Sequence, residues 1–270
     1  MIMNARKSTR NPTRTAFVIG LTSILVLGWT VANADETDAK RLLKAMSDYT
    51  ASLKSYSFDY DAMLDVVTPE DQVIGIASSG SVSFVRPNKI HAARHGGFAD
   101  VEMNFDGTTL TILGKNLNAF TQVEIPGTVD HLIDELKDTY HRPLPAADLL
   151  LANSYDILMQ GVVDVKDLGS GVINGMECDS LAFRTEEVDW QIWIAQGEKP
   201  YPCRYVITSK TISGGPQYSV QISNWKAGDE VAARDFTFKA PAGATQVEIE
   251  DLKGSGDLPE IFVEDKGEAE

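Results

Sequence analysis

The spacing of hydrophobic side chains predicts a helix followed by a strand where the folded part of the chain begins. Between residues 37 and 53 the apolar positions recur every three or four residues, which is the spacing of one face of a helix that Thr37 or Asp38 can cap. From residue 58 to residue 66 every second position is apolar, and three aspartates lie between them. Such alternation is typical of a strand with one buried face and one solvated face.

Five further apolar runs predict strands that continue this pattern. They cover residues 73–86, 89–94, 101–105, 109–113 and 119–125. Asp106-Gly107 lies between two of these runs, and an Asp-Gly pair in that place is a strong signal for a tight hairpin turn. The first half of the chain therefore has the pattern of an antiparallel meander.

The middle of the chain returns to helical spacing after Pro126-Gly127. From Thr128 the positions 129, 132, 133 and 136 are apolar, and Pro143 and Pro145 end the stretch. A second helical stretch is predicted over 146–158, and strands are predicted over 162–168, 171–184, 188–195, 204–210, 218–225 and 236–239. One antiparallel sheet with helices inserted in mid-chain is an α+β domain. We expect a single domain over 35–250 and a flexible acidic tail over 251–270.

The first 34 residues have the pattern of a cleaved signal peptide. Four basic residues precede an apolar run over 16–31, and Ala32-Asn33-Ala34 follows as a cleavage sequence. The run is shorter than the roughly 20 apolar residues of a spanning helix. No cysteine follows Ala34 to carry a lipid. We therefore expect an exported protein that is cleaved after Ala34 and is not lipidated.

The charge balance excludes two classes of partner. The chain has 39 acidic and 24 basic residues, a net charge of −15 at pH 7, and the predicted signal peptide holds four of the basic ones. An acidic surface repels the phosphates of nucleic acids and of anionic lipid headgroups. We therefore expect neither nucleic-acid binding nor attachment to a membrane through a basic patch. The hydrophobic fraction of 43% is enough for a large core.

Cys178 and Cys203 leave two alternatives open. Export to an oxidising compartment favours a disulfide between them. In a simple meander, however, the strands that begin at these residues lie about 9.6 Å apart, whereas a disulfide needs Cα atoms within about 7 Å. Two buried free thiols are the alternative. No C-x-x-C motif occurs, so neither a redox pair nor a thiolate zinc site is expected.

Three motifs resemble the LolA-like superfamily of periplasmic outer-membrane lipoprotein carriers. In the family's order they are G-x-x-x-x-x-R-P-N within 79–90, D-G-T-T-L at 106–110 and F-x-F-x-A-P-x-G at 236–243. The middle departs from this pattern, because 128–160 is longer and more helical than in a plain carrier. The stretches 180–184 and 189–194 look like those of uncharacterised predicted periplasmic proteins with the same fold.

The resemblance implies a strongly curved antiparallel β-sheet, a half-open barrel, with a helical lid inserted in mid-chain over an apolar cavity. It implies a periplasmic carrier or chaperone that holds the acyl chains of a lipid or lipoprotein and uses no cofactor. The alternative is a non-catalytic interaction or sensor module of the same fold that binds another envelope protein. Since one fold hosts many functions, the resemblance supports the fold more than the cargo.

The apolar faces supply the candidate ligand-binding residues. They are Phe58, Tyr60, Leu64, Phe84, Met103, Phe105, Trp190, Ile192 and Ile194 from strands, and Leu132, Ile133, Leu136, Leu149 and Leu150 from the lid. For each one the alternative is an ordinary core residue, because apolar faces with a period of two are usually buried.

Arg86 is the candidate lid latch. It stands where the LolA-like family has an arginine that hydrogen-bonds the backbone of the closed lid, a role that suits the five donors of a guanidinium. The alternative is an arginine at a strand end that pairs with one of many surface acids.

No arrangement of residues points to catalysis or to a metal site. No G-x-S-x-G motif occurs, and no nucleophile has an identifiable base. His91 and His95 would lie about 13 Å apart along a strand, too far to share a metal. The three aspartates at 59, 61 and 65 lack the loop glycine and distal glutamate of a calcium site. We therefore expect neither an enzyme nor a metalloprotein.

Overall fold

The computed structural model describes residues 36–232 and 235–249. The predicted signal peptide, with its cleavage site after Ala34, and the predicted acidic tail over 251–270 lie outside these residues. Within the described ranges, none of the helices has the length and apolar composition needed to cross a lipid bilayer.

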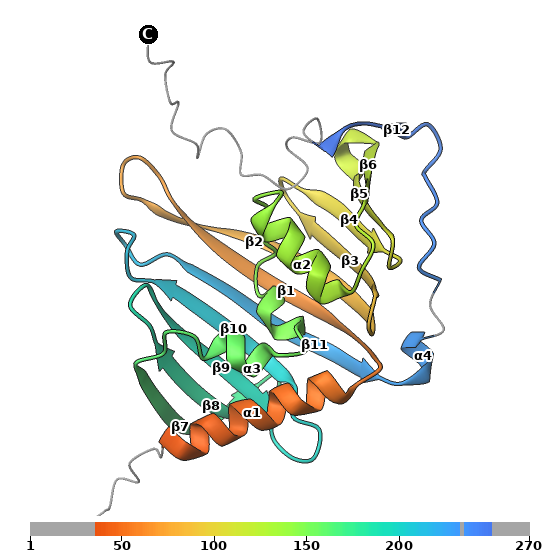
Figure 1. The fold of residues 1–270 in the computed structure, drawn as a ribbon. Coiled ribbons are helices and arrows are strands. Elements are labelled where there is room, and N and C mark those ends of the chain that lie inside the picture. The colour runs from red at the N-terminus through yellow and green to blue at the C-terminus, as the bar shows by residue number, and fades with distance from the viewer. Residues whose placement is uncertain (1–35, 233–234, 250–270) are drawn as a thin grey trace, which may run out of the picture. The chain divides into compact units, whose positions relative to one another are not determined.

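One twelve-stranded sheet dominates the described part of the chain (Figure 1). Its strands are β1 (Ser55–Val67), β2 (Val73–Val85), β3 (Lys89–Gly96), β4 (Asp100–Phe105), β5 (Thr109–Gly114), β6 (Ala119–Glu124), β7 (Asp164–Ile173), β8 (Met176–Arg184), β9 (Val188–Ala195), β10 (Pro202–Ser209), β11 (Gln217–Ala227) and β12 (Thr245–Gln246). Their spatial order is β12-β6-β5-β4-β3-β2-β1-β11-β10-β9-β8-β7. Neighbouring strands are antiparallel except β12 and β6, which are parallel. The sheet is open, because β7 and β12 are its two edges.

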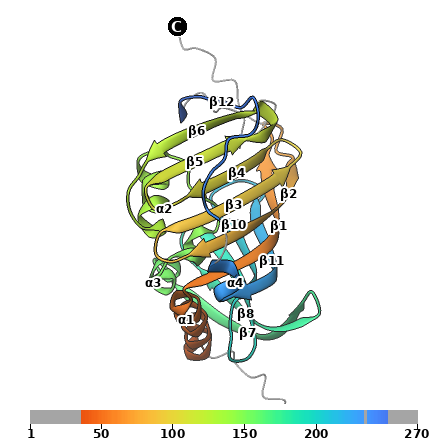
Figure 2. The ribbon, with the colours of Figure 1, turned by 90° about the vertical axis from the view of Figure 1, so that its right-hand side faces the viewer.

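The helices gather mainly on one face of the sheet, which we call the inner face. It carries α1 (Glu36–Ser52), α2 (Val129–Asp138), the 3-10 turn η2 (Ala147–Leu150) and α3 (Ser154–Leu158). A second 3-10 turn, η1 (Lys115–Leu117), connects β5 to β6, and α4 (Asp229–Ala232) follows β11. The extended segment after residue 235 crosses the outer face of β3–β5 before it reaches β12 (Figure 2).

The α+β class and the curved antiparallel sheet predicted from the sequence are confirmed. β1 has the predicted alternation, since Phe58 and Ala62 are buried while Asp59 and Asp61 are exposed. The inserted helix α2 begins after Thr128, whose side chain accepts a hydrogen bond from the backbone N–H of residue 131 at 3.1 Å. This is the geometry of a helix cap.

The boundary between the strands predicted over 162–168 and 171–184 is wrong. β7 and β8 turn at Asn174-Gly175, where both residues have positive φ (51° and 78°), as a two-residue hairpin turn requires. The predicted break near Gly169 is a bulge inside β7, because the register shifts between Asp167 and Ser170.

Two other predicted elements differ from the structure. The strand predicted over 236–239 does not form, and the carbonyl of Phe236 there accepts a hydrogen bond from the side chain of Asn104. The helix predicted over 146–158 is split into η2 and α3, because Leu151 is extended (φ −65°, ψ 147°).

Two apolar clusters divide the inner face. One joins β7–β10 to α1 and contains Leu43, Phe183 and Ile192. The other joins β1–β5 to α2 and contains Phe84 and Leu132. We call the first region the α1 half, and the second, together with β11, the α2 half.

Candidate functional site

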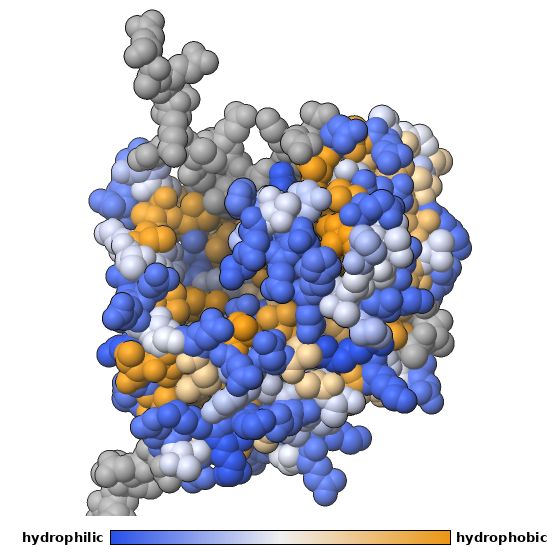
Figure 3. Space-filling view, in the orientation of Figure 1, coloured by the Kyte–Doolittle hydropathy of each residue, from blue (hydrophilic) through white to orange (hydrophobic). Residues whose placement is uncertain are grey.

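A cavity of about 490 Å³ lies on the inner face of the α2 half. Strands β1–β5 and β11 form most of its floor, and part of the segment 129–158, which we call the cover, closes it from the other side. Figure 3 shows a hollow beside α2, with hydrophobic residues along its edges. The volume lies within the range of about 300–1,000 Å³ typical of small-molecule sites.

The structure divides the predicted ligand-binding residues into two groups. The residues on the cavity lining are Phe58, Tyr60, Leu64, Met103, Leu136, Leu149 and Leu150. The residues in the packed clusters away from that lining are Phe84, Phe105, Leu132, Ile133, Trp190, Ile192 and Ile194. Both groups contain strand residues with a period of two and cover residues with helical spacing, so the apolar spacing does not separate them.

The β9 residues are kept from the cavity by α1. Trp190, Ile192 and Ile194 pack in one cluster with Leu43 and Met46, two fully buried residues of α1. A helix thus fills the space that the prediction assigned to a ligand in this half.

Sequence reasoning did not name the cavity residues from β11 and from the loop after α2. Tyr218, Ile222 and Trp225 line the cavity because β11 pairs with β1, with Ile222 opposite Tyr60. The apolar spacing of 218, 220 and 222 is the signal that could have found the β11 residues. The loop residues 141–147 also line the cavity and carry no comparable pattern.

The cover is attached to the rest of the molecule near its two ends. At its start, the N–H of Val129 donates to the carbonyl of Pro87 at 2.9 Å. Near its end, the hydroxyls of Ser154 and Ser47 of α1 are 2.6 Å apart, and the N–H of Tyr155 donates to the same Ser47 hydroxyl at 2.9 Å. These contacts hold the cover over the sheet.

Arg86 makes the backbone contact that the resemblance implies for a latch. Its Nη2 donates to the carbonyl of Leu150 at 3.0 Å, and its Nη1 lies 3.9 Å from Oδ1 of Asp130. Asp130 Oδ2 in turn accepts from the N–H of Ala152 at 3.2 Å. The guanidinium also lies 4.8 Å from the ring centroid of Phe84. With its side chain only 15% exposed, Arg86 connects the end of β2 to α2 and η2.

Polar side chains of the cavity gather around Arg94. The register of β1, β2 and β3 places Tyr60, Gly80 and Arg94 in one row. The Tyr60 ring lies over Gly80, where an added Cβ would come within 2.5 Å of the ring, and its hydroxyl donates to the carbonyl of Ala93 at 3.2 Å. Burial raises the pKa of Tyr60 and raises that of Tyr218 to about 12, whereas the positive charge of Arg94 lowers both pKa values.

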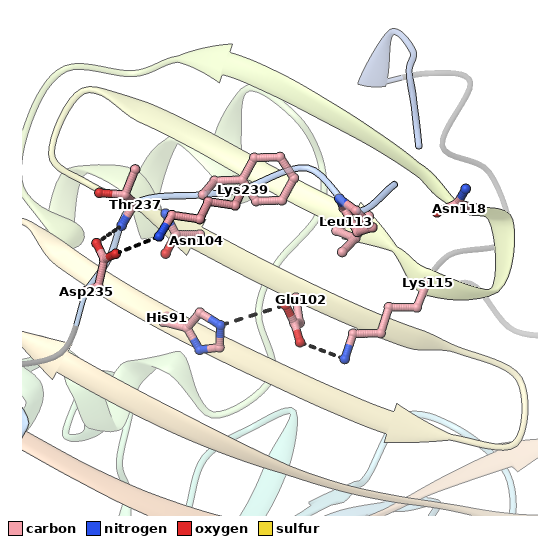
Figure 4. A pocket seen from close by; sticks show the side chains of 11 residues that line it. His91, Glu102, Asn104, Leu113, Lys115, Asn118, Asp235, Thr237 and Lys239 are labelled. Atoms are coloured by element: carbon pink, nitrogen blue, oxygen red, sulfur yellow. Dashed lines mark hydrogen bonds and ion pairs between the residues drawn. The ribbon is translucent and has the colours of Figure 1, made fainter. Parts of the chain in front are cut away.

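A second pocket of about 490 Å³ lies on the outer face, between β3–β5 and the extended segment 235–241 (Figure 4). Lys115 Nζ lies 2.6 Å from Oε1 of Glu102, and His91 Nε2 lies 4.0 Å from Oε2 of the same residue. Lys239 Nζ donates to Oδ2 of Asp235 at 3.3 Å. Since these charges pair with one another, we take the apolar inner cavity as the candidate site.

Cys178 and Cys203 are both free thiols, and both are buried. They lie on β8 and β10, on either side of β9, in a small cluster with Ala195. Burial raises the pKa of both thiols, which disfavours the reactive thiolate. Of the two alternatives left open by the sequence, the structure contains the buried thiols.

A comparison with protein families finds one that spans most of the chain. The family described as "Predicted periplasmic protein (DUF2092)" matches residues 39–250. This match confirms the predicted resemblance to uncharacterised periplasmic proteins. A search of curated proteins finds no match.

Several solved structures are similar to this chain at low sequence identity. Lipoprotein LppX of Mycobacterium tuberculosis is 15% identical, with 73% of this chain and 100% of that chain covered and a TM-score of 0.46. LprF of Mycobacterium bovis is 12% identical, with 77% and 100% covered and a TM-score of 0.44. A LolA superfamily protein of Nitrosomonas europaea is 10% identical, with 74% and 99% covered and a TM-score of 0.35.

Proposed function

We propose that this chain, which belongs to the DUF2092 family of predicted periplasmic proteins, binds the acyl chains of a lipid or lipoprotein and carries them within the periplasm. The observation that carries the proposal is the cavity of about 490 Å³ on the inner face of the α2 half, with its largely apolar lining. Export with cleavage after Ala34 is part of the proposal. Binding and release need no catalytic residue, metal or cofactor.

Burial of apolar surface supplies the affinity in this proposal. Each methylene transferred from water into the cavity contributes about 0.8 kcal/mol, so about ten methylenes contribute roughly 8 kcal/mol before the cost of association is subtracted. Phe58, Met103 and Ile222 offer apolar contacts on the floor, and Leu149 and Leu150 offer them on the cover.

The contacts of Arg86 support a cover that opens and closes. A hydrogen bond from Arg86 to Leu150 and a longer ion pair to Asp130 hold η2 and α2 against the end of β2. These contacts of Arg86 involve no strand pairing, so the sheet keeps its hydrogen bonds when they break. The latch role predicted for Arg86 is therefore part of the proposal.

A cavity-filling variant tests the proposal. Ala92 faces the cavity from β3, so Ala92→Phe places a ring where an acyl chain would lie. We expect this variant to bind a fluorescent palmitate analogue at least about tenfold more weakly than the parent protein, a loss of about 1.4 kcal/mol. Ala77→Phe is the matched control, because Ala77 is exposed on the outer face of the neighbouring strand β2.

Two results would contradict the proposal. One is a parent protein that takes up no fluorescent fatty acid and yields no acyl chains by mass spectrometry after gentle extraction. The other is equal affinity in the parent, Ala92→Phe and Ala77→Phe proteins, which would place the binding outside the cavity. Either result would favour the alternative, a non-catalytic module that binds another envelope protein.

A further inference from the structure

The cavity lining has the opposite charge from the chain as a whole. The chain has a net charge of −15, but the charged or titratable side chains among the described residues that line the cavity are Arg94, Arg142 and His141, together with tyrosines, and none is an aspartate or glutamate. Fixed charges act most strongly in a cleft with apolar walls. Acyl chains are uncharged, so their binding does not explain why an acidic protein has an arginine in the cavity.

Arg94 lacks the aspartate partner that several arginines of the structure have, and unlike Arg204, which lies over the ring of Trp193, it lines the cavity. Arg41, Arg86 and Arg184 each lie within 4.0 Å of an aspartate oxygen. In the part of the chain that the structure describes, no carboxylate lies within this distance of Arg94. Its guanidinium is half-buried on the lining, beside the phenols of Tyr60 and Tyr218. A cation held there against apolar walls lacks the counterion that buried charges normally have.

Two further donors on the lining have no partner. The hydroxyl of Tyr56 and the indole N–H of Trp225 are buried without a hydrogen bond among the described residues, and both residues line the cavity. Buried polar groups in native proteins are usually paired, and an unpaired one costs about 1–3 kcal/mol. An oxygen atom of a guest could accept a hydrogen bond from either group.

We propose that the guest is an amphiphile with an anionic head, whose carboxylate or phosphate binds the guanidinium of Arg94 beside the hydroxyl of Tyr218. This inference rests on the proposed function and narrows it from acyl chains in general to acyl chains with an anionic head. A guanidinium binds either group through two parallel hydrogen bonds. In this arrangement the acyl chain lies along Phe58 and Met103.

The test compares charged and uncharged amphiphiles that carry the same acyl chain. Palmitate, palmitoyl lysophosphatidate and the uncharged monopalmitoylglycerol each displace a fluorescent monoacylglycerol analogue from the full-length mature protein. Arg94→Gln removes the charge and keeps hydrogen-bonding groups. We expect it to weaken binding of the better anionic ligand about 10- to 100-fold, the range for hydrogen bonds to charged groups, and to change monopalmitoylglycerol binding less than about twofold.

Two other variants serve as controls. Arg41→Gln removes the same charge from the exposed surface of α1, and we expect it to leave all three affinities unchanged. Arg94→Lys keeps the charge but loses the bidentate geometry of the guanidinium. We therefore expect its affinity for the anionic ligand to lie between those of the parent protein and Arg94→Gln. Circular dichroism and thermal unfolding of each variant check that the fold is intact.

The outcomes separate this inference from the proposed function. If Arg94→Gln weakens the binding of charged and uncharged ligands equally, or of neither, the proposal of an anionic head is wrong. The proposal of an acyl-chain site then stands. If the parent binds neither the probe nor any of the three amphiphiles, the proposed function fails and the inference fails with it. A larger Arg94 effect on lysophosphatidate than on palmitate would identify phosphate as the head, and the reverse would identify carboxylate.

Discussion

The two halves of the inner face have similar strands and different covers. In the α1 half, the seventeen-residue helix α1 places Ala39, Leu43 and Met46 on the sheet, and all three are fully buried. In the α2 half, the ten-residue helix α2 is followed by a loop and two shorter helical turns, and a cavity remains beneath them. The hollow therefore arises from the cover and not from the sheet.

Helix length explains much of this difference. An α-helix rises 1.5 Å per residue, so α1 spans about 25 Å and α2 about 15 Å. Pro143 and Pro145 follow α2 and do not continue a helix, because proline has no N–H to donate. A short interrupted cover cannot place side chains over the whole floor, and the uncovered part is the cavity.

Truncation of one leucine in each half is the strongest test of the comparison. Leu43 is fully buried under α1, so we expect Leu43→Ala to lower the free energy of unfolding by about 2–5 kcal/mol. Leu64 is half-buried and borders the cavity, so Leu64→Ala should cost about 1 kcal/mol. Urea unfolding followed by circular dichroism measures both losses. Equal losses would show that the α2 half is packed as tightly as the α1 half.

Removal of the proposed latch tests the mobility of the cover. Arg86→Leu deprives the carbonyl of Leu150 and the carboxylate of Asp130 of their shared partner. We expect the free energy that favours the closed position of the cover to fall by about 1.5–3 kcal/mol, the range for hydrogen bonds to charged groups. A bound fluorescent palmitate analogue should then leave at least about tenfold faster in a stopped-flow experiment.

The control for the latch lies in the other half of the sheet. Arg184→Leu removes an exposed pair with Asp189, whose oxygen lies 2.7 Å from Arg184 Nε. We expect the release rate of this variant to equal that of the parent protein. If Arg86→Leu also releases the ligand at the parent rate, Arg86 is not a latch.

Substitution of Asp148 in η2 should change the free energy of unfolding least, and the change should depend on pH. Burial raises the pKa of this carboxyl above its ordinary value of 3.8, and the positive charge of Lys137 partly offsets the rise. A raised pKa means that the folded state holds the proton more tightly than the unfolded state. The contribution of Asp148 to stability is therefore complete below pH 3.8 and is lost as the pH rises through the raised value.

We therefore expect Asp148→Asn to be more stable than the parent protein at pH 7 and to lose this advantage in acid. Urea midpoints measured at intervals between pH 4 and pH 7 check the expectation. Asp134→Asn, on the exposed side of α2, is the matched control and should change the midpoint little. A parent-like midpoint for Asp148→Asn at pH 7 would show that burial of the carboxyl has no energetic consequence.

The sequence predicts which side of a strand is buried but not what covers that side. β9 matches its prediction at both ends, and β1 has the predicted alternation. Phe58 and Trp190 carry the same period-two signal, yet Phe58 lines the cavity while Trp190 lies under α1. The contact between α1 and β9 joins segments far apart in the chain, and local periodicity holds no information about it.

The predicted and observed elements differ at the turn between β7 and β8 and over residues 236–239, and these two differences have separate causes. The Asn174-Gly175 turn follows from local chemistry, since both residues adopt positive φ readily, and the dipeptide itself is a readable signal. The path of residues 236–239 depends instead on a hydrogen bond from Asn104 of β4. Arg86 is a third case, because a motif singles out this residue, which contacts the cover, although no periodicity does.

The attachment of the cover makes the volume of the cavity independent of the pairing of the sheet. The backbone hydrogen bonds that residues 139–147 donate end on the cover's own residues, while the ends of the cover are fixed to Pro87 and Ser47. Insertions or deletions in this loop therefore leave the register of every strand unchanged, and longer surface loops cost little free energy. Under the proposed function, changes in this one connecting segment would alter which guests fit the cavity and leave the fold intact.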